Sequence, residues 1–208
     1  MNAPTLRQLA GVPAQFQAGK TLETGRCALL LIDYQQIYAD GPLALPGCAA
    51  AAKTAIALRR WAEAKGLAVI HVLHEAASPQ APLFAPGSRE VQPLAGLEPA
   101  EGEAVVIKRL PSSFAGTNLA DLLAERGIDT LLIAGLMTHN CVDAAAREAF
   151  HRGLRVAVIA DACATRDLPG PDGAIIPAAL VHAAVLAGLG DRQAEIVPTA
   201  TLMAMHCA

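Results

Sequence analysis

The stretch TLLIAGLMTHNCVDAAAREAFHRGLRVAVIAD, residues 130–161, decides the fold class. An apolar run at 130–135 ends in a glycine, an alanine-rich segment from about 139 to 152 ends before Gly153, and a second apolar run fills 155–161. Apolar runs without polar alternation are typical of strands whose two faces are both covered. The stretch therefore predicts a strand, a crossover helix and a second, parallel strand.

The same alternation of apolar runs and helical segments extends over most of the chain. Further strands are predicted at 27–32, 68–73, 104–108 and 194–197, and further helices at 47–66, 117–127 and 172–189. A proline- and glycine-rich loop at 75–102 is long enough to suggest a functional role. The pattern predicts one domain over 1–208, with a parallel sheet, helices on both faces and an N-terminal extension at 1–25.

Composition excludes several classes of partner. The 208 residues are 53% hydrophobic and 3% aromatic, with a net charge of −3 and no long run of one sign. We therefore expect no nucleic-acid partner and no membrane partner. We recognise neither a signal peptide nor an apolar run long enough to span a membrane, so a cytoplasmic location is expected. The odd number of cysteines, without CxxC spacing, argues against a disulfide framework or a structural zinc site.

Three chemically distinct side chains follow predicted strands. Asp33 follows 27–32, Lys108 ends 104–108, and Cys141 follows 130–135. Ligands of parallel sheets bind at the carboxyl ends of strands, so an acid, a base and a thiol are expected at one edge. Alone, each has a structural explanation: a turn or cap, a snorkelling lysine and a small buried hydrophobe. Their joint position favours chemistry.

The three residue types suit nucleophilic catalysis. The start of a helix carries partial positive charge, which favours the thiolate form of Cys141. A nearby carboxylate, Asp33, could take the thiol proton as general base, and Lys108 could stabilise negative charge. Backbone N–H groups near Cys141 could bind an oxyanion.

Four segments, in this order, resemble the isochorismatase-like cysteine hydrolase superfamily: ALLLIDYQQIYADGPLALPG (28–47), VIKRLPSSFAGTNLADLL (106–123), TLLIAGLMTHNCVDAAAREAFHRG (130–153) and VAVIADACATRDL (156–168). The resemblance implies a three-layer α/β/α fold with a six-stranded parallel sheet in Rossmann-like order. It implies a triad of Asp33, Lys108 and Cys141 and a cis peptide at Leu136–Met137. The N–H groups of Met137 and Cys141 would form the oxyanion hole.

The activity that the resemblance implies is hydrolysis of a C–N bond in a small amide, lactam or carbamoyl compound through a thioester, without a cofactor. Two alternatives stay open: an isochorismatase-type ether hydrolase that does not use the cysteine, and a redox-sensing member without catalysis. Many relatives are dimers or tetramers, so a homo-oligomer is expected.

The second strand departs from the nicotinamidase pattern. His71 and His74 are present, but the metal-binding Asp-x-His pair is not, so no metal is expected. His71 is expected to pack inside the strand, and His74 to face the pocket. The chain is more similar to the streptothricin-hydrolase-like branch, whose substrates are poorly defined.

Four residues are candidates for substrate contact: His74, Phe114, Tyr38 and His139. Packing under a loop is an equal alternative for Phe114, and helix capping is the favoured interpretation for His139. Tyr38 and its neighbour Tyr34 are expected to line the mouth of the site, with a surface turn as the alternative. Asp161 is expected to cap the turn that follows it. Cys163 is a less favoured nucleophile than Cys141.

Overall fold

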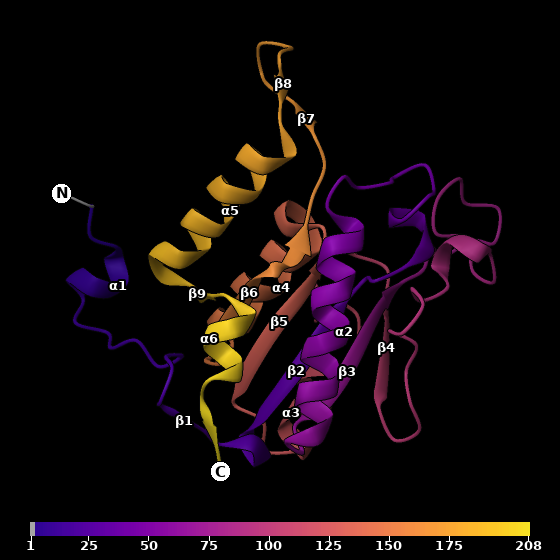
Figure 1. Ribbon diagram of the computed structural model, residues 1–208. Helices are drawn as coiled ribbons and strands as arrows, with labels where there is room; N and C mark the ends of the chain where they lie inside the picture. The colour runs from indigo at the N-terminus through magenta and orange to yellow at the C-terminus, as the bar shows by residue number, and fades with distance from the viewer. Residues whose placement is uncertain (1–2) are drawn as a thin grey trace.

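The structure, a computed structural model, describes residues 3–208. Its centre is a six-stranded sheet in the order β4-β3-β2-β5-β6-β9, in which every neighbouring pair is parallel (Figure 1). The strands are β2 (Cys27–Ile32), β3 (Ala68–His74), β4 (Ala104–Lys108), β5 (Thr130–Leu136), β6 (Arg155–Ala164) and β9 (Glu195–Val197). The six-stranded parallel sheet is confirmed.

Strand order reverses at the middle of this sheet. The chain runs from β2 outward through β3 to β4, then returns to β5 on the other side of β2 and continues to β6 and β9. This is the Rossmann-like order that was expected. In such sheets a crevice forms outside the carboxyl ends of the two strands at the reversal, which here are β2 and β5.

Helices cover both faces of the sheet, which confirms the three layers. One face packs against α2 (Cys48–Ala64) and α6 (Thr199–Met203), whose buried residues include Leu58 and Leu202. The other face packs against α3 (Leu119–Glu125), α4 (Asp143–His151) and α5 (Ala178–Arg192). The two central strands, β2 and β5, are covered on both sides and are buried along their whole length.

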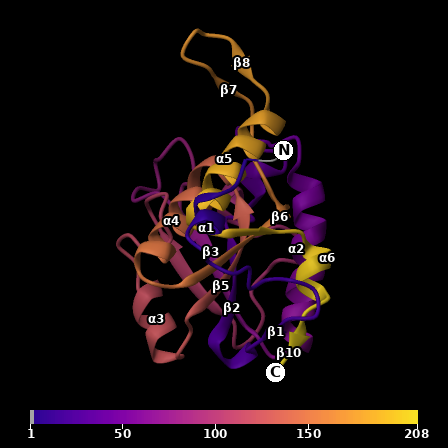
Figure 2. The same ribbon diagram turned by 90° about the vertical axis from the view of Figure 1, so that its left-hand side faces the viewer.

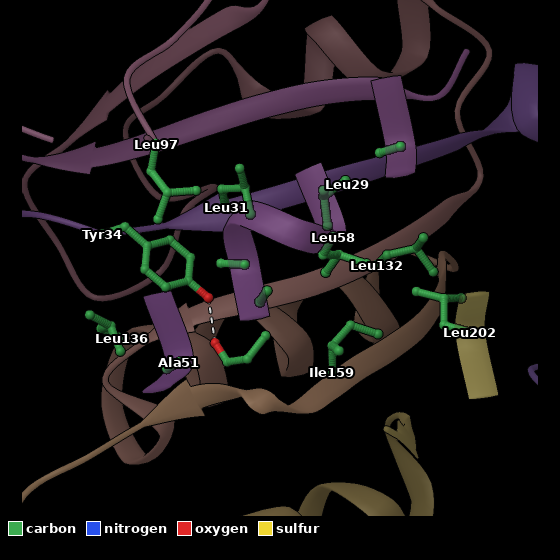
Figure 3. Close-up of a cluster of buried hydrophobic side chains, with 14 of the residues drawn as sticks. Leu29, Leu31, Tyr34, Ala51, Leu58, Leu97, Leu132, Leu136, Ile159 and Leu202 are labelled. Atoms are coloured by element: carbon green, nitrogen blue, oxygen red, sulfur yellow. Dashed lines mark hydrogen bonds between the residues drawn. The ribbon is translucent and has the colours of Figure 1, made fainter. Parts of the chain in front are cut away.

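Figure 3 shows the core between the sheet and α2. Leu31 and Leu132 of the sheet lie near Leu58 of the helix, and the ring of Tyr34 fills the end of the cluster. The Tyr34 hydroxyl donates a hydrogen bond to the carbonyl of Ala162. The expectation that Tyr34 lines the mouth of the site is therefore wrong. A buried phenol needs a partner, and this carbonyl supplies one.

The helix predicted at 172–189 begins later. Residues 168–176 form a hairpin of β7 (Leu168–Pro169) and β8 (Ile175–Ile176), and α5 starts only after Pro177. The hairpin stands away from the body of the fold (Figures 1 and 2). Its turn contains Gly173 at φ +81°, which favours glycine. The prolines and glycines at 169–173 were available as a signal for this turn.

Two other predicted elements differ in length from the observed ones. The strand predicted at 155–161 continues to Ala164. The helix predicted at 117–127 is shorter, α3 (Leu119–Glu125), with Asn118 at the N-cap position, and the Thr117 hydroxyl accepts the Leu119 N–H at 3.2 Å.

Short elements complete the fold. The N-terminal segment contains α1 (Leu6–Leu9) and β1 (Thr21–Leu22), and β1 pairs with β10 (His206–Cys207) near the C-terminus. Single helical turns lie at η1 (Thr24–Arg26), η2 (Gln36–Tyr38) and η3 (Arg89–Val91). The Leu6 N–H donates to Asp191 of α5, and Arg7 pairs with Glu195 of β9 at 2.8 Å. The segment before β2 therefore packs against the last part of the chain.

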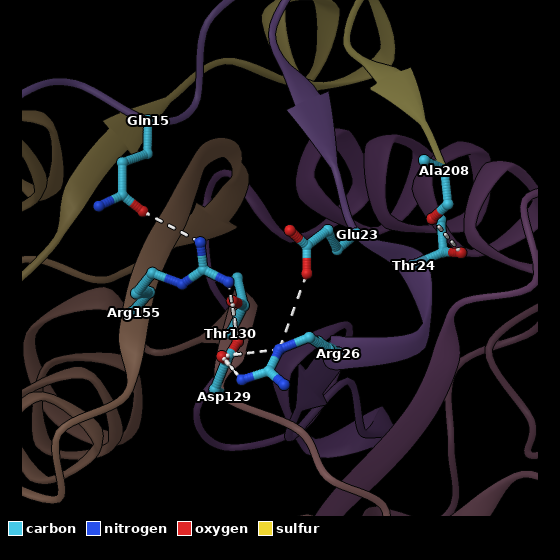
Figure 4. A network of polar contacts seen from close by, with 8 residues as sticks. All are labelled: Gln15, Glu23, Thr24, Arg26, Asp129, Thr130, Arg155 and Ala208. Atoms are coloured by element: carbon cyan, nitrogen blue, oxygen red, sulfur yellow. Dashed lines mark hydrogen bonds and ion pairs between the residues drawn. The ribbon is translucent and has the colours of Figure 1, made fainter.

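A polar network ties together the amino ends of the central strands (Figure 4). Asp129, just before β5, pairs with Arg26, just before β2, and with Arg155 at the start of β6 at 2.8 Å. Although burial opposes ionisation, hydrogen bonds from Arg155, Thr130 and Arg26 lower the pKa of Asp129 to about 2. This network lies at the end of the sheet opposite to the carboxyl ends. Over residues 3–208, none of the helices has the length and apolar character that crossing a membrane requires.

Candidate active site

The strand ends bring together the three side chains that the sequence singled out. Lys108 Nζ lies 2.8 Å from Asp33 Oδ2 and 3.2 Å from Cys141 Sγ. Relative exposure is 0% for Asp33, 1% for Lys108 and 3% for Cys141. The structure therefore places an acid, a base and a thiol in one buried cluster at the point where strand order reverses.

Asp33 leaves β2 through an unusual backbone conformation. Its φ is +54°, in the left-handed region that few residues other than glycine adopt, although aspartate tolerates it better than most. Its N–H still bonds to the carbonyl of Val72, at 2.8 Å, which continues the ladder to β3. The chain therefore turns sharply at Asp33 while this residue stays anchored to the sheet. Strained backbone of this kind is often found at functional sites.

Cys141 lies in a π-helical turn, Thr138–Val142, directly before α4. The Val142 N–H bonds to the carbonyl of Met137, at 3.3 Å, across five residues. The sequence predicts a helix from about 139. The chain is helical there, but the first turn is a π-helical turn, which is wider than a turn of α-helix. Such turns occur mostly as single insertions at functional sites. The peptide bond at Leu136–Met137 is cis.

Gly135 fixes the close approach of β5 to β2 just beneath this turn. A Cβ atom built at Gly135 would lie 2.6 Å from the carbonyl oxygen of Ile32. The pairing of β5 with β6 also shifts register between Ile133 and Gly135. A bulge next to a site can redirect the residues that follow it. The glycine thus lets the Met137–Cys141 segment lie against the end of β2.

Burial opposes ionisation of the Cys141 thiol. Burial, reinforced by the Asp33 carboxylate, raises the pKa of Cys141 to about 12, although the Lys108 charge acts in the opposite direction. The sequence argument expected the helix start to favour the thiolate. The loss of water around the buried sulfur acts against that effect. A base is then needed to remove the proton.

Asp33 and Lys108 form a buried ion pair. Burial raises the pKa of Asp33, and the Lys108 charge pulls it back. Burial also disfavours the ammonium of Lys108, but the Asp33 carboxylate raises the pKa of this lysine above its ordinary value. A side-chain hydrogen bond with Cys141 also acts to lower the pKa of Asp33, so the thiol lies within reach of the carboxylate. The carboxylate can therefore receive the proton of the thiol.

His74 contacts the cluster through Lys108. The two residues are register partners on β3 and β4, and His74 Nδ1 lies 3.0 Å from Lys108 Nζ. Burial, and then the Lys108 charge, lowers the pKa of His74 to about 4, so the ring is neutral at pH 7. Because the ammonium only donates, Nδ1 must accept, and the imidazole proton sits on Nε2. His74 was expected to face the pocket, and the structure shows it in contact with Lys108.

The ring of Phe84 adjoins His74, and the ring of Tyr38 lies next to Phe84. Phe84 lies with its ring centroid 4.5 Å from that of His74 and 5.9 Å from that of Tyr38. Burial, and then the Asp33 carboxylate, raises the pKa of Tyr38. Tyr38 is thus a buried neighbour of the cluster and not a surface turn residue. Phe84 belongs to the long loop and has φ +58°. Sequence analysis missed Phe84, and only the scarcity of aromatic residues could have drawn attention to it.

Gln35 is a second residue that sequence analysis missed. Its side chain is fully buried, accepts the His74 N–H and donates to the His74 carbonyl, each at 2.9 Å. It also donates to the carbonyl of Val91, at 2.9 Å. Gln35 therefore ties the end of β3 to the long loop and fixes His74. The sequence did offer one signal for Gln35, namely a polar residue two positions after Asp33.

Two candidates for substrate contact lie apart from this cluster. Phe114 is buried between α3 and α4, and the guanidinium of Arg152 lies 5.0 Å from its ring centroid. This arrangement favours the packing alternative for Phe114. His139 is half-buried, and its Nδ1 contacts the hydroxyl of Thr165 after β6. His139 thus joins the nucleophile turn to the next strand end and does not cap a helix.

Three further expectations concern residues outside the cluster. His71 is buried in β3, as expected, with Nε2 2.9 Å from Glu103. Asp161 accepts the N–H of Thr199, at 2.9 Å, so it caps α6 and not the turn that follows it. Burial raises the pKa of Cys163 to about 12. Among residues 3–208 there is no group of three or more metal-binding side chains.

Comparison with known proteins identifies relatives over most of the chain. The model of the isochorismatase domain family matches residues 27–189. The chain is 36% identical to the secreted isochorismatase effector Isc1 of Verticillium dahliae, over 88% of this chain and 94% of that protein. It is 36% identical to a streptothricin hydrolase of Streptomyces noursei, over 87% of this chain and 71% of that protein.

Two more comparisons bear on the fold and on the chemistry. Maleamate amidohydrolase of Pseudomonas putida is 34% identical, over 67% of this chain and 72% of that protein. The crystal structure of an isochorismatase from Pseudomonas putida superposes with a TM-score of 0.85 at 34% identity, over 96% of this chain and 98% of that one. The related sequences and the superposed crystal structure therefore identify the same protein family.

Proposed function

Because the chain belongs to the isochorismatase family of hydrolases, we propose that it cleaves a C–N bond of a small amide, lactam or carbamoyl compound with Cys141 as nucleophile. The observation that carries the proposal is the position of Lys108, whose ammonium lies within hydrogen-bond distance of both Asp33 and Cys141. The names of two relatives, a streptothricin hydrolase and a maleamate amidohydrolase, support a hydrolase of this class.

The first step forms a thioester. Asp33 takes the proton of the Cys141 thiol, and the sulfur attacks the substrate carbonyl carbon. A buried carboxylate with a raised pKa suits this task, because it can hold the proton and later return it. The departing nitrogen takes that proton from Asp33 as the C–N bond breaks. The acyl group stays on Cys141.

The second step releases the acid. Asp33, again ionised, takes a proton from water, the hydroxide oxygen attacks the thioester, and the C–S bond breaks. The thiolate that leaves recovers the proton from Asp33. Lys108 donates hydrogen bonds to Asp33 and Cys141 in both steps. These bonds stabilise each state in which negative charge sits on oxygen or sulfur.

The N–H groups of Met137 and Cys141 are proposed to hold the oxyanion in both steps. The turn at Thr138–Val142 supports this role, because it brings the two ends of a five-residue segment back beside each other. A single donor of this kind contributes about 3–4 kcal/mol to an acyl transfer.

The test is ammonia or amine release from a panel of small amides, lactams and carbamoyl compounds, with Cys141→Ala and Asp33→Asn beside the wild type. Each variant is expected to lose at least about a thousandfold in kcat, as when one member of a catalytic unit is removed. Asp121→Asn on the exposed side of α3 is the matched control and should keep full activity. Full turnover by Cys141→Ala would contradict the proposal and favour an ether hydrolase that does not use the thiol.

A further inference from the structure

The outer side of β4 is an unpaired edge of the central sheet. β4 has β3 as its one neighbour, and over residues 3–208 no other strand pairs with it (Figure 1). The Lys108 carbonyl accepts the Glu75 N–H, at 3.0 Å, on the β3 side. Backbone groups of successive strand residues point to alternate sides, so those of Val105 and Ile107 point outward. They form a row of donors and acceptors along the edge.

The side chains along this edge are apolar and exposed. Val106 packs into the core beside α3, whereas Val105 is 45% exposed and Ile107 is 41% exposed. Leu110, just after the strand, is exposed as well. Natural proteins protect edge strands with charge, proline, a bulge or a covering segment, because an apolar edge pairs readily with another chain. The middle of β4, AVVI, has no charge and no proline.

The opposite edge of the sheet is protected. β9 has only three residues, and the N-terminal segment lies against it. Glu195 of β9 pairs with Arg7 at 2.8 Å and accepts the Phe16 N–H at 3.1 Å. The fold therefore covers the edge at β9 and leaves the edge at β4 open.

The charges at the two ends of β4 favour a second copy of this chain as the partner. Arg109 follows the strand, is exposed, and forms no ion pair within residues 3–208. Glu103 precedes the strand, and its Oε1 accepts only from Arg59 Nε, at 3.0 Å. Antiparallel pairing of two copies about Val106 places Arg109 of each copy opposite Glu103 of the other. Opposite charges across a strand pair are stabilising.

We propose that two copies of this chain associate through antiparallel pairing of β4 with β4, which joins their sheets into one. Val105 of each copy lies opposite Ile107 of the other, and these two residues exchange backbone hydrogen bonds. The contact uses the same patch on both copies, so it closes at a dimer. It lies on the strand that ends in Lys108. The inference concerns association alone and does not depend on the proposed chemistry.

Sedimentation velocity over a range of protein concentrations measures the association. The wild type is expected to form a dimer with a dissociation constant in the micromolar range, because the contact is small. Val105→Lys should raise this constant at least about tenfold, because pairing would then remove water from a charge at the edge. Leu180→Lys is the matched control: Leu180 is 61% exposed on α5, and its replacement should leave association unchanged.

A second pair of variants tests the charges. Arg109→Glu places like charges opposite each other in the pairing and should also weaken the dimer. Arg60→Glu changes the net charge equally at an exposed position of α2 and should have no effect. Thermal melts of each variant check that the fold is intact.

Amide hydrogen exchange locates the contact in the wild type itself. The segment 104–110 should exchange more slowly at high protein concentration than at low concentration, and the hairpin at 168–176 should exchange equally at both. A monomer at every concentration, exchange at 104–110 that ignores concentration, or a dimer that Val105→Lys leaves intact would overturn the inference. Dissociation by Leu180→Lys alone would also overturn it and would assign the contact to α5.

Discussion

Lys108 Nζ and Asp33 Oδ2 form an ion pair at 2.8 Å in which both side chains have no exposed surface. Removal of one partner of a buried pair leaves the other charged and unpaired, which costs about 3–5 kcal/mol. Asp33→Asn and Lys108→Met are therefore each expected to lower the free energy of unfolding by roughly this amount.

The double variant Asp33→Asn, Lys108→Met tests the coupling. It should be less destabilised than the sum of the single variants, because neither charge is left alone. Urea unfolding at pH 7 measures all four proteins. Strict additivity of the two single effects would contradict a direct interaction between the two side chains.

The ionisation of Cys141 can be followed directly. Since burial and the Asp33 carboxylate raise its pKa to about 12, the thiol should stay protonated from pH 6 to 9. The difference in thiolate absorbance near 240 nm between the wild type and Cys141→Ala should be flat across this range. A rise with a midpoint below pH 8 would show an ion-paired thiolate and contradict the raised pKa.

His74 should act as a positioning residue through Lys108. His74→Phe keeps a ring against Phe84 but removes the acceptor for the ammonium, so kcat should fall by about tenfold while KM changes little. His74→Asn, which retains a polar acceptor, should recover part of the loss. Because the His74 pKa is about 4, protonation below pH 4 removes the acceptor and places a second cation beside Lys108.

The measurement for His74 is the pH profile of kcat. The wild type should lose activity as pH falls through about 4, and His74→Phe should lack that part of the acid limb. An unchanged acid limb together with an unchanged kcat in His74→Phe would rule out this role.

The central strands could be predicted because their sequences are apolar on both faces. β2 and β5 read as unbroken apolar runs, and the residues that follow them, Asp33 and Cys141, stand out by contrast. The segment at 168–176 could not be assigned in the same way. Ile175 and Ile176 resemble core residues, yet they lie in a projecting hairpin, whose turn was signalled by the prolines and glycines at 169–173.

The contacts of His74 could not be predicted from the sequence for another reason. They depend on the register of β3 against β4, which places His74 beside Lys108, and a shift of one residue would turn His74 to the other face. The protonated state of Cys141 likewise depends on how fully water is excluded. Strand ends can be recognised from composition, whereas register and burial need the assembled fold.

Asp129 should make stability depend on acid pH. Its pKa is about 2 in the folded protein, and the ordinary value of an aspartate is about 3.9. The folded state thus binds the proton less readily than the unfolded state, so the contribution is full above pH 4 and is lost as pH falls toward 2. Asp129→Asn should cost about 1 kcal/mol at pH 7, because the pairs with Arg26 and Arg155 are partly exposed.

The gap in stability between the wild type and Asp129→Asn should therefore close between pH 4 and pH 2. Urea unfolding across this range measures the gap, and a constant difference would show that the carboxylate charge is not its cause.

Gly135 should tolerate no side chain. In Gly135→Ala the new Cβ would lie 2.6 Å from the Ile32 carbonyl oxygen, so β2 and β5 must separate where Asp33 and Cys141 meet. We expect a loss of about 2–3 kcal/mol in the free energy of unfolding, as for overpacked cores, together with loss of activity. Gly188→Ala is the matched control: its Cβ has no neighbour closer than 3.8 Å, and alanine should stabilise α5 by about 0.5–1 kcal/mol. Urea unfolding and ammonia release compare the two variants, and a Gly135→Ala protein with wild-type stability would mean that the strands are not this close.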